Sequence, residues 1–143
     1  MMKKILAVLA AFCCIALTAA PPEGWGTDYD AALAQAAREG KTVLVLFTGS
    51  DWCSWCIKLR KETLDKPAFQ KFAEENLVLV YMDMPRNQPI DEKVKIQAFA
   101  RKLQAGNGVP CTVLVGPDGE VKGKISGYRP LKKYLDEIEK IIR

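Results

Sequence analysis

The chain of 143 residues contains no histidine, and this absence argues against several kinds of metal and haem site. Its C-x-x-C sequence, Cys53 to Cys56, is followed by Ile57 and not by the histidine of a c-type haem attachment sequence. A structural zinc ion usually takes four Cys or His ligands. Such a site here would need Cys111 as a third thiolate and an acidic residue or water as the fourth ligand. We therefore predict that the protein binds no metal and needs no cofactor.

A strong excess of charge of either sign is also missing. The 21 Lys and Arg residues and the 17 Asp and Glu residues give a net charge of +4, and two of the positive charges are Lys3 and Lys4. The other charges are interspersed, with no basic stripe or aromatic ladder of the kind that binds nucleic acid. The composition, 49% hydrophobic and 27% charged, is that of a soluble globular protein. We predict a single domain, monomeric and without a nucleic-acid partner.

The N-terminal segment has the layout of a secretory signal peptide. Two lysines precede an uncharged apolar stretch, residues 5–17, and small residues follow before a pair of prolines. The stretch is shorter than the roughly 20 residues that cross a bilayer, which argues against a stable membrane anchor. We predict a signal peptide over residues 1–20, a folded domain over residues 21–143, and an exported protein that is periplasmic or secreted.

Cleavage of this signal peptide would remove two of the five cysteines. Cys13 and Cys14 lie inside the apolar stretch, and no small residue precedes Cys13, so lipidation is not expected. The mature chain keeps Cys53, Cys56 and Cys111, an odd number that cannot pair internally without a remainder. An oxidising compartment makes a Cys53–Cys56 disulfide reasonable. The spacing alone also allows a metal half-site or a purely structural disulfide.

Patterns of apolar residues predict elements in the order α-β-α-α-β-α-β-β-α. Continuous β-branched runs indicate strands that are buried on both faces, and apolar residues at helical spacing indicate helices. The first helix is expected to take Thr27 as its N-cap and to stop at Gly40. The strands are expected at 42–48, 77–84, 111–115 and 120–126, and the helices at 27–41, 57–66, 67–76, 91–104 and 129–143.

The connections between these elements define the fold class. A helical crossover makes the first two strands parallel, and the turn "GPDG" makes the last two a hairpin. We predict an α/β fold: a mixed four-stranded sheet with helices on both faces, preceded by an N-terminal helix. The last two helices are expected to pack through apolar faces made of Val94, Ile96, Phe99, Ala100 and Leu103, and of Leu131, Leu135, Ile138 and Ile141.

A buried strand that runs into "WCSWC" at a helix start, with "VP" at the head of a hairpin strand about 54 residues later, resembles the thioredoxin superfamily. The leading helix, the extended "FTGSDWC" turn and the strand ending in "MDMPRN" are most similar to exported thioredoxin-like and disulfide isomerase-like proteins. The resemblance covers Trp25 to the C-terminus. It implies a thioredoxin-like fold and a thiol–disulfide oxidoreductase that acts on cysteines of exported proteins, together with a redox partner protein.

The resemblance also assigns roles to individual residues. Cys53 corresponds to the nucleophilic cysteine and Cys56 to the resolving one, which together form a redox-active disulfide. Trp52 corresponds to the aromatic residue that shields the motif. Pro110 corresponds to the cis-proline beside the disulfide, and Val109 to the residue whose backbone pairs with an extended substrate. The alternative for Pro110 is a proline at a strand edge.

Two positions depart from the pattern of the superfamily. Leu46 and Leu79 stand where a buried Asp and its partner Lys often occur. Cys53 at the start of a helix would be favoured as a thiolate by unpaired N–H groups and the helix dipole. Because the buried Asp is missing, the sequence does not show which group removes the proton of Cys56. Asp51 or a bound water could serve.

Other residues near the motif keep two interpretations. Trp55 either packs on the domain surface or forms with Trp52 an apolar rim that binds polypeptide. Cys111 is either a buried small hydrophobic residue or a third thiol that can react with Cys53. The rim suggests an alternative function, a non-catalytic module that binds proteins or peptides. We predict a catalytic protein that works as a reductase or isomerase.

Overall fold

The computed structural model describes residues 20–143. Nearly all of the predicted signal peptide, including Cys13 and Cys14, lies outside these residues, so the prediction for residues 1–20 stays a prediction. From residue 20 onward, no helix combines the length and hydropathy needed to cross a membrane.

The elements follow the predicted order, with one irregular continuation of the helix after the cysteines. That helix changes from an α-helix to a short π-helix, η1, before the next helix begins at a proline. The elements are α1 (Tyr29–Glu39), β1 (Thr42–Thr48), α2 (Ser54–Leu59), η1 (Arg60–Leu64), α3 (Pro67–Asn76), β2 (Leu77–Asp83), α4 (Ile90–Lys102), β3 (Cys111–Val115), β4 (Val121–Ser126) and α5 (Leu131–Ile142).

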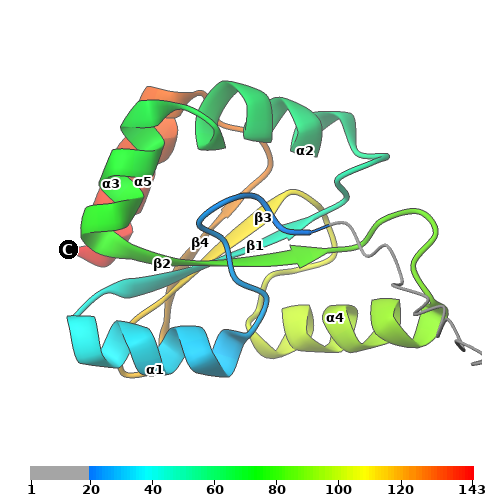
Figure 1. Cartoon of the computed structure of the whole chain (residues 1–143), viewed down its shortest axis with the longest axis horizontal. Coiled ribbons are helices and arrows are strands. Elements are labelled where there is room, and N and C mark those ends of the chain that lie inside the picture. Colours follow the sequence, from blue (N-terminus) through cyan, green and yellow to red (C-terminus); the bar gives the residue numbers. More distant parts are fainter. Residues whose placement is uncertain (1–19) are drawn as a thin grey trace, which may run out of the picture.

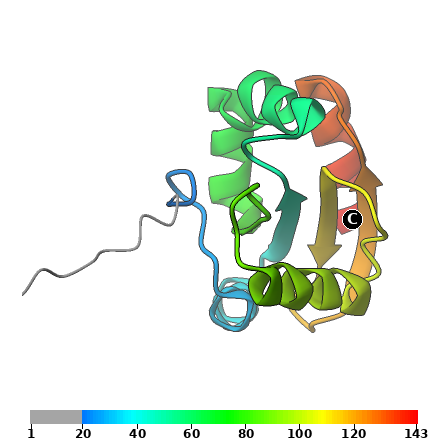
Figure 2. The same cartoon turned by 90° about the vertical axis from the view of Figure 1, so that its right-hand side faces the viewer.

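The strands form one sheet in the order β2-β1-β3-β4. Strand β1 is parallel to β2 and antiparallel to β3, and β3 is antiparallel to β4. Helices α2, α3 and α5 cover one face, and α1 and α4 cover the other (Figures 1 and 2). The predicted mixed four-stranded sheet with helices on both faces is therefore confirmed.

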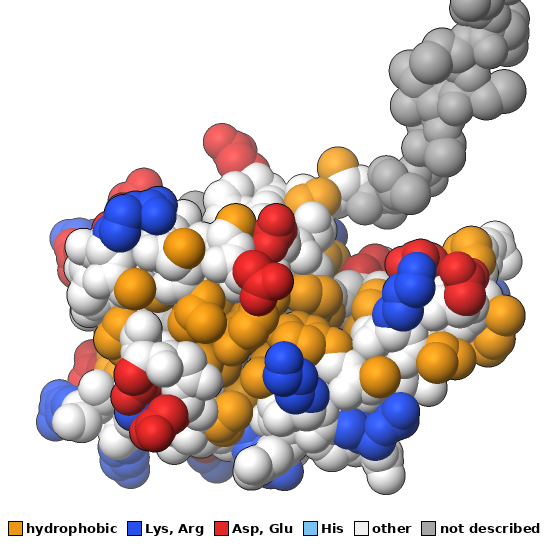
Figure 3. Space-filling model, turned by 90° about the horizontal axis from the view of Figure 1, so that it is seen from below, with side chains coloured by type: hydrophobic (Ala, Val, Ile, Leu, Met, Phe, Trp, Pro, Cys, Tyr) orange, Lys and Arg blue, Asp and Glu red, His pale blue; other side chains and the backbone are white. Residues whose placement is uncertain are grey.

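Each face of the sheet has its own apolar core, because successive side chains of a strand point to opposite faces. In β1, Val43, Val45 and Phe47 pack under α1 and α4, while Leu44 and Leu46 pack under α2, α3 and α5. All five are at most 2% exposed. Viewed from the side of α1 and α4, apolar side chains gather in the middle of the face, with charged side chains around them (Figure 3). Burial on both faces explains why β1 reads as an unbroken apolar run.

Two predicted details of the helices are wrong. The N-cap of α1 is Asp28, not Thr27, since Asp28 has an extended backbone and its carboxylate accepts a hydrogen bond from the N–H of Ala31 at 3.0 Å. In α4, Val94 is 51% exposed and does not belong to the packed face. It lies two positions before Ile96, and two positions are about 200° around a helix.

The closing helix packs through a residue that the apolar pattern left out. Tyr134 is fully buried with Ile138, and its hydroxyl shares a hydrogen bond of 2.6 Å with Thr112 in β3. Leu131 and Leu135 are only partly buried. A tyrosine can be placed in a core when its hydroxyl finds a partner, and the sequence does not reveal that partner.

Candidate active site

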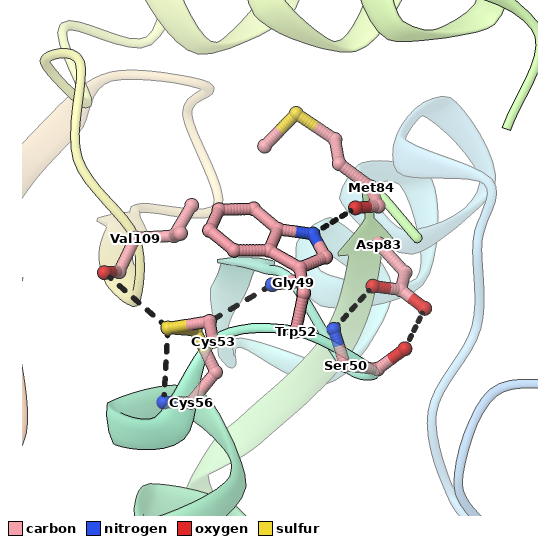
Figure 4. Close-up of a disulfide and its surroundings, with 8 residues drawn as sticks. All are labelled: Gly49, Ser50, Trp52, Cys53, Cys56, Asp83, Met84 and Val109. Carbon is pink, nitrogen blue, oxygen red and sulfur yellow. Dashed lines mark hydrogen bonds between the residues drawn. A yellow bond between two sulfur atoms is a disulfide. The ribbon is translucent and has the colours of Figure 1, made fainter. Parts of the chain in front are cut away.

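The two cysteines lie where β1 leads into α2. A turn of residues 49–52 follows the strand, Cys53 is the N-cap of α2, and Cys56 lies one turn further along that helix. The two are joined as a disulfide with a Cα–Cα separation of 5.2 Å (Figure 4). Cys53 is 8% exposed and Cys56 is 3% exposed. Cys53 is thus the sulfur nearer to solvent, as expected of an attacking thiol.

Main-chain N–H groups point at both sulfur atoms. The N–H of Cys56 donates to Cys53 Sγ at 3.2 Å, and the N–H of Gly49 donates to Cys56 Sγ at 3.5 Å. Hydrogen bonds from N–H groups stabilise a sulfur that carries negative charge more than one that is neutral. The site can therefore support a thiolate at either position after reduction.

Val109 and Pro110 lie directly across from Cys53. The Val109–Pro110 peptide bond is cis, as predicted. The carbonyl oxygen of Val109 lies 3.7 Å from Cys53 Sγ, and the carbonyl of Pro110 accepts a hydrogen bond from the N–H of Gly127 at 2.8 Å. The role of Val109 and Pro110 in substrate binding stays a prediction.

Trp52 covers the turn before the cysteines. Its indole N–H donates to the carbonyl of Met84 at 2.7 Å, and the side chain is 46% exposed. The indole lies so close over Gly49 that a Cβ atom at that position would overlap it. Trp52 therefore shields the turn and keeps one face of its ring open to solvent.

The rest of the turn is hydrogen-bonded to the last residue of β2 and to the loop that follows it. The N–H and hydroxyl of Ser50 both donate to the carboxylate of Asp83, at 2.9 and 2.5 Å. The carboxylate of Asp51 accepts from the N–H of Arg86, at 2.9 and 3.2 Å. Asp51 thus holds a loop in this structure, and its suggested part in deprotonating Cys56 stays a prediction.

Sequence reasoning missed Gly49, Ser50 and Asp83. The predicted parallel pairing of the first two strands could have indicated this contact. Parallel strands of equal length end at the same edge of a sheet, so the residues that follow β1 lie beside the end of β2. Thr48 is indeed the register partner of Asp83. A serine and an aspartate at those positions were therefore candidates for a contact.

On the helix side of the disulfide, Trp55 belongs to a small exposed cluster. Its ring lies 5.7 Å from that of Tyr128, measured between centroids, and the Lys58 ammonium lies 5.3 Å from the Trp55 ring and 4.8 Å from the Tyr128 ring. The Tyr128 hydroxyl donates to Glu62 at 2.6 Å, which raises the pKa of Tyr128. Trp55 nevertheless stays 56% exposed. Trp55 thus packs on the domain surface, as one interpretation held, and its part in a rim that binds polypeptide stays a prediction.

The third cysteine is buried. Cys111 is 1% exposed, and its thiol donates to the carbonyl of Ala105 at 3.0 Å. Burial raises the pKa of the Cys111 thiol. The expected packing role is confirmed, whereas a reaction with Cys53 stays a prediction. Within residues 20–143, no three Cys, His, Asp or Glu side chains are grouped as metal ligands would be.

A cavity of about 210 Å³ lies between the end of β1, helix α4 and the loop of residues 105–109, and neither disulfide cysteine lines it. Met84 and Val109 line it next to Trp52 and Cys53, and Phe47 forms part of its apolar wall. Gln97 and Arg101 of α4 contribute polar groups. The cavity has room for one side chain of a bound polypeptide.

Comparison with known proteins supports the relationship inferred from the motif. Residues 29–142 match the thioredoxin-like domain family. The disulfide bond reductase DsbH of Chlamydia pneumoniae is 32% identical over 105 residues, which are 72% of this chain and 62% of that protein. The thioredoxin-related protein DsbJ of the same organism is 35% identical over 92 residues, which are 64% of this chain and 26% of that protein. The chain thus spans less than two thirds of the length of either relative.

Solved structures show the same fold. A DsbH oxidoreductase structure superposes with a TM-score of 0.70 at 26% identity, covering 88% of this chain and 92% of that one. The C-terminal domain of DsbD from Neisseria meningitidis, in its oxidised form, superposes with a TM-score of 0.62 at 23% identity, covering 81% and 97%. At that identity the second likeness concerns the fold alone.

Proposed function

This chain belongs to the thioredoxin-like family, and from that premise we propose that it is an exported thiol–disulfide oxidoreductase that reduces or isomerises disulfides in other exported proteins. The observation that carries the proposal is the Cys53–Cys56 disulfide at the start of α2, with the N–H of Cys56 on Cys53 Sγ at 3.2 Å. A short disulfide of this kind closes a small loop and stabilises a fold only weakly. Its position at the start of a helix, where a thiolate is favoured, suits exchange with another disulfide.

The reaction proceeds in two exchanges. The Cys53 thiolate attacks one sulfur of a substrate disulfide, which forms a Cys53–substrate disulfide and releases the other substrate sulfur as a thiolate. The Cys56 thiolate then attacks Cys53 Sγ, breaks the bond to the substrate and releases its second sulfur. Two electrons pass to the substrate, whose thiolates take up two protons. A partner protein with a dithiol must then reduce Cys53–Cys56 again.

Substrate polypeptide would bind across the exposed side of Cys53. The backbone of Val109 faces Cys53, and Trp52 and Trp55, the residues one before and two after Cys53 in the chain, have exposed rings. The adjoining cavity can take a side chain next to the substrate cysteine. An extended segment of an incompletely folded protein fits these features better than a rigid globular surface, because its backbone and side chains are free to enter.

The direction of electron flow is proposed to be reductive. DsbH, a relative, is named a disulfide bond reductase. No histidine stands between the cysteines to stabilise the Cys53 thiolate as in strongly oxidising relatives. The proposed setting is outside the cytoplasm, after removal of the signal peptide over residues 1–20. N-terminal sequencing of the protein recovered from an exporting bacterium tests that cleavage, and an unprocessed N-terminus would contradict it.

The activity is tested by insulin reduction with a thiol donor that recycles the protein. Cys53→Ser should abolish catalysis, and Cys56→Ser should accumulate a mixed disulfide with the substrate. Cys111→Ser is the matched control and should keep wild-type activity, since Cys111 is buried away from solvent. Full activity of Cys53→Ser would contradict the proposal. If Cys53 and Cys56 never change oxidation state in glutathione buffers, the protein is a binding module instead.

A further inference from the structure

The step that closes the Cys53–Cys56 disulfide needs negative charge on a sulfur that is almost wholly buried. Cys56 is 3% exposed, and burial disfavours a thiolate because it removes the solvating water. The core on this side of the sheet, which includes Leu46 and Leu59, is apolar. Across residues 20–143 the buried side chains with polar atoms are threonines, tyrosines and cysteines, and none is a carboxylate. No buried carboxylate is therefore present in this part of the chain to assist Cys56.

The main chain of Gly49 supplies a hydrogen-bond donor at this sulfur. Its N–H donates to Cys56 Sγ at 3.5 Å. A fixed N–H group aimed at an atom that gains negative charge stabilises that charge without having to reorient during the reaction, as in an oxyanion hole. The donor is useful only while the peptide group of Gly49 keeps its orientation.

The first peptide group at Gly49 is held at its opposite end. The carbonyl of Thr48 belongs to the same peptide group as the N–H of Gly49, and it accepts a hydrogen bond from the N–H of Met84 at 2.9 Å. Rotation of this peptide group would therefore break the bond to Met84 together with the bond to Cys56.

The second peptide group at Gly49 is held by Asp83. The carbonyl of Gly49 accepts from the N–H of Cys53 at 3.0 Å, and at the other end of this group the N–H of Ser50 donates to Asp83. The Ser50 hydroxyl donates to the second carboxylate oxygen, so Asp83 holds Ser50 through both of its oxygens (Figure 4). Asp83 is the last residue of β2 and is thus fixed by the sheet.

The Trp52 indole packs against Gly49 and limits the movement of the turn. It lies over Gly49 with no room for a Cβ atom, and its N–H is bound to the carbonyl of Met84. Hydrogen bonds from the end of β2 and the covering ring together leave the Gly49 peptide groups with one arrangement.

We propose that the N–H of Gly49 is the catalytic group that stabilises the Cys56 thiolate, and that Asp83, acting through Ser50, is the positioning residue that keeps it there. The inference rests on the proposed function and concerns its second exchange. In that step Cys56, having lost its proton to water, attacks Cys53 Sγ. The bond between Cys53 and the substrate breaks, and the substrate sulfur departs with the electron pair.

The experiment separates the two exchanges with dithiobis-nitrobenzoate, an aromatic disulfide whose released thiolate absorbs visible light. In stopped flow, attack by reduced Cys53 releases one aromatic thiolate, and ring closure by Cys56 releases the second. Reduced wild-type protein is compared with Ser50→Ala, Asp83→Ala and Asp83→Asn. Asp136→Asn, which removes a surface carboxylate paired with Lys132, is the control. Circular dichroism and thermal melting establish that each variant is folded.

Asp83→Ala, which removes both hydrogen bonds to Ser50, should slow the second release roughly tenfold, about what the loss of a hydrogen bond to a charged group produces. Ser50→Ala, which keeps the main-chain N–H bond to Asp83, should slow it measurably but less. The first release should change less than about twofold. Asp83→Asn should recover most of the second rate, because its amide can still accept from the Ser50 N–H and can donate to the Ser50 hydroxyl. The deficit of the alanine variants should shrink from about pH 7 to about pH 9, as more thiolate forms without assistance.

The possible failures are distinguishable. If wild-type protein gives no first release, the proposed function itself fails. If both releases occur and Ser50→Ala and Asp83→Ala leave the second unchanged, the proposal of a Gly49 N–H positioned by Asp83 is overturned, while the proposed function stands. An Asp83→Asn variant as slow as Asp83→Ala would show that the charge of Asp83 acts, and would also overturn the positioning role. Should Asp83→Ala not fold, Ser50→Ala decides alone, since it removes a single hydroxyl group.

Discussion

The two sides of the disulfide are held in different ways. On the turn side, residues 50, 51 and 52 each form hydrogen bonds to residues 83–86, at and just after the end of β2. On the helix side, Trp55 contacts Lys58 and Tyr128 through ring and cation contacts at the surface. Hydrogen bonds that engage main-chain groups fix orientation closely, whereas exposed contacts between long side chains tolerate movement. The turn side is therefore suited to hold the reacting sulfurs, and the helix side to accommodate varied substrates.

The largest effect on stability is expected from crowding the turn. Gly49→Ala would place a Cβ atom against the Trp52 indole. Overpacking of this kind costs about 1–3 kcal/mol of unfolding free energy. Urea denaturation measures the loss. In the Trp52→Ala background the same substitution should cost much less, and an equal cost in both backgrounds would contradict the packing of Trp52 over Gly49.

A smaller loss is expected when Trp52 keeps its ring but loses its donor. Trp52→Phe removes the hydrogen bond to the carbonyl of Met84, which is worth about 0.5–1.5 kcal/mol. Urea denaturation again gives the value. Trp55→Phe is the matched control, because the indole N–H of Trp55 donates no hydrogen bond to another of the described residues, and it should cost less than Trp52→Phe. The reverse order would mean that the turn side is not the more firmly held.

Stability should respond still less to the helix side. Lys58→Met keeps the apolar stem of the side chain but removes the ammonium that lies over the two rings. We expect the melting temperature to change by less than about 3 °C. The KM for a protein substrate should change more than kcat, because this cluster contacts no reacting atom. A large fall in kcat would place Lys58 in the chemistry instead.

The smallest effect concerns ionisation of one tyrosine. The hydrogen bond to Glu62 raises the pKa of Tyr128, so its contribution to stability is present below the unfolded tyrosine value of about 10 and is lost as pH rises through the folded value. Glu62→Gln should move the ionisation of Tyr128 to lower pH. Ultraviolet difference titration, with Tyr128→Phe to identify the signal, measures the shift. An unchanged titration would show that the bond does not persist in solution.

How far the sequence predicted these features depends on how local their cause is. The strands follow from runs of β-branched residues. Strand β1 at residues 42–48 and helix α3 at residues 67–76 have the predicted bounds. The cysteine pair at a helix start and the cis bond before Pro110 follow from short motifs. The contacts on the turn side could not be predicted from a short motif, because the contact between Ser50 and Asp83 depends on the register of two strands.

The contacts on the helix side could not be predicted from the sequence either. Tyr128 lies far along the chain from Trp55, and no periodicity links the two. Tyr134 was missed for a similar reason, since its burial depends on Thr112 in another element. Such pairings become visible only when the strands and helices have been placed in space.

The central claim, that Cys53 and Cys56 form a reducing couple, is tested most directly by its reduction potential. The protein is equilibrated with glutathione buffers, the free thiols are alkylated, and the fraction of Cys53–Cys56 disulfide is measured by mass spectrometry. We predict a potential between the values of thioredoxin and protein disulfide isomerase, about −270 to about −180 mV. A value near that of DsbA, about −120 mV, would contradict the claim and make the protein a donor of disulfides.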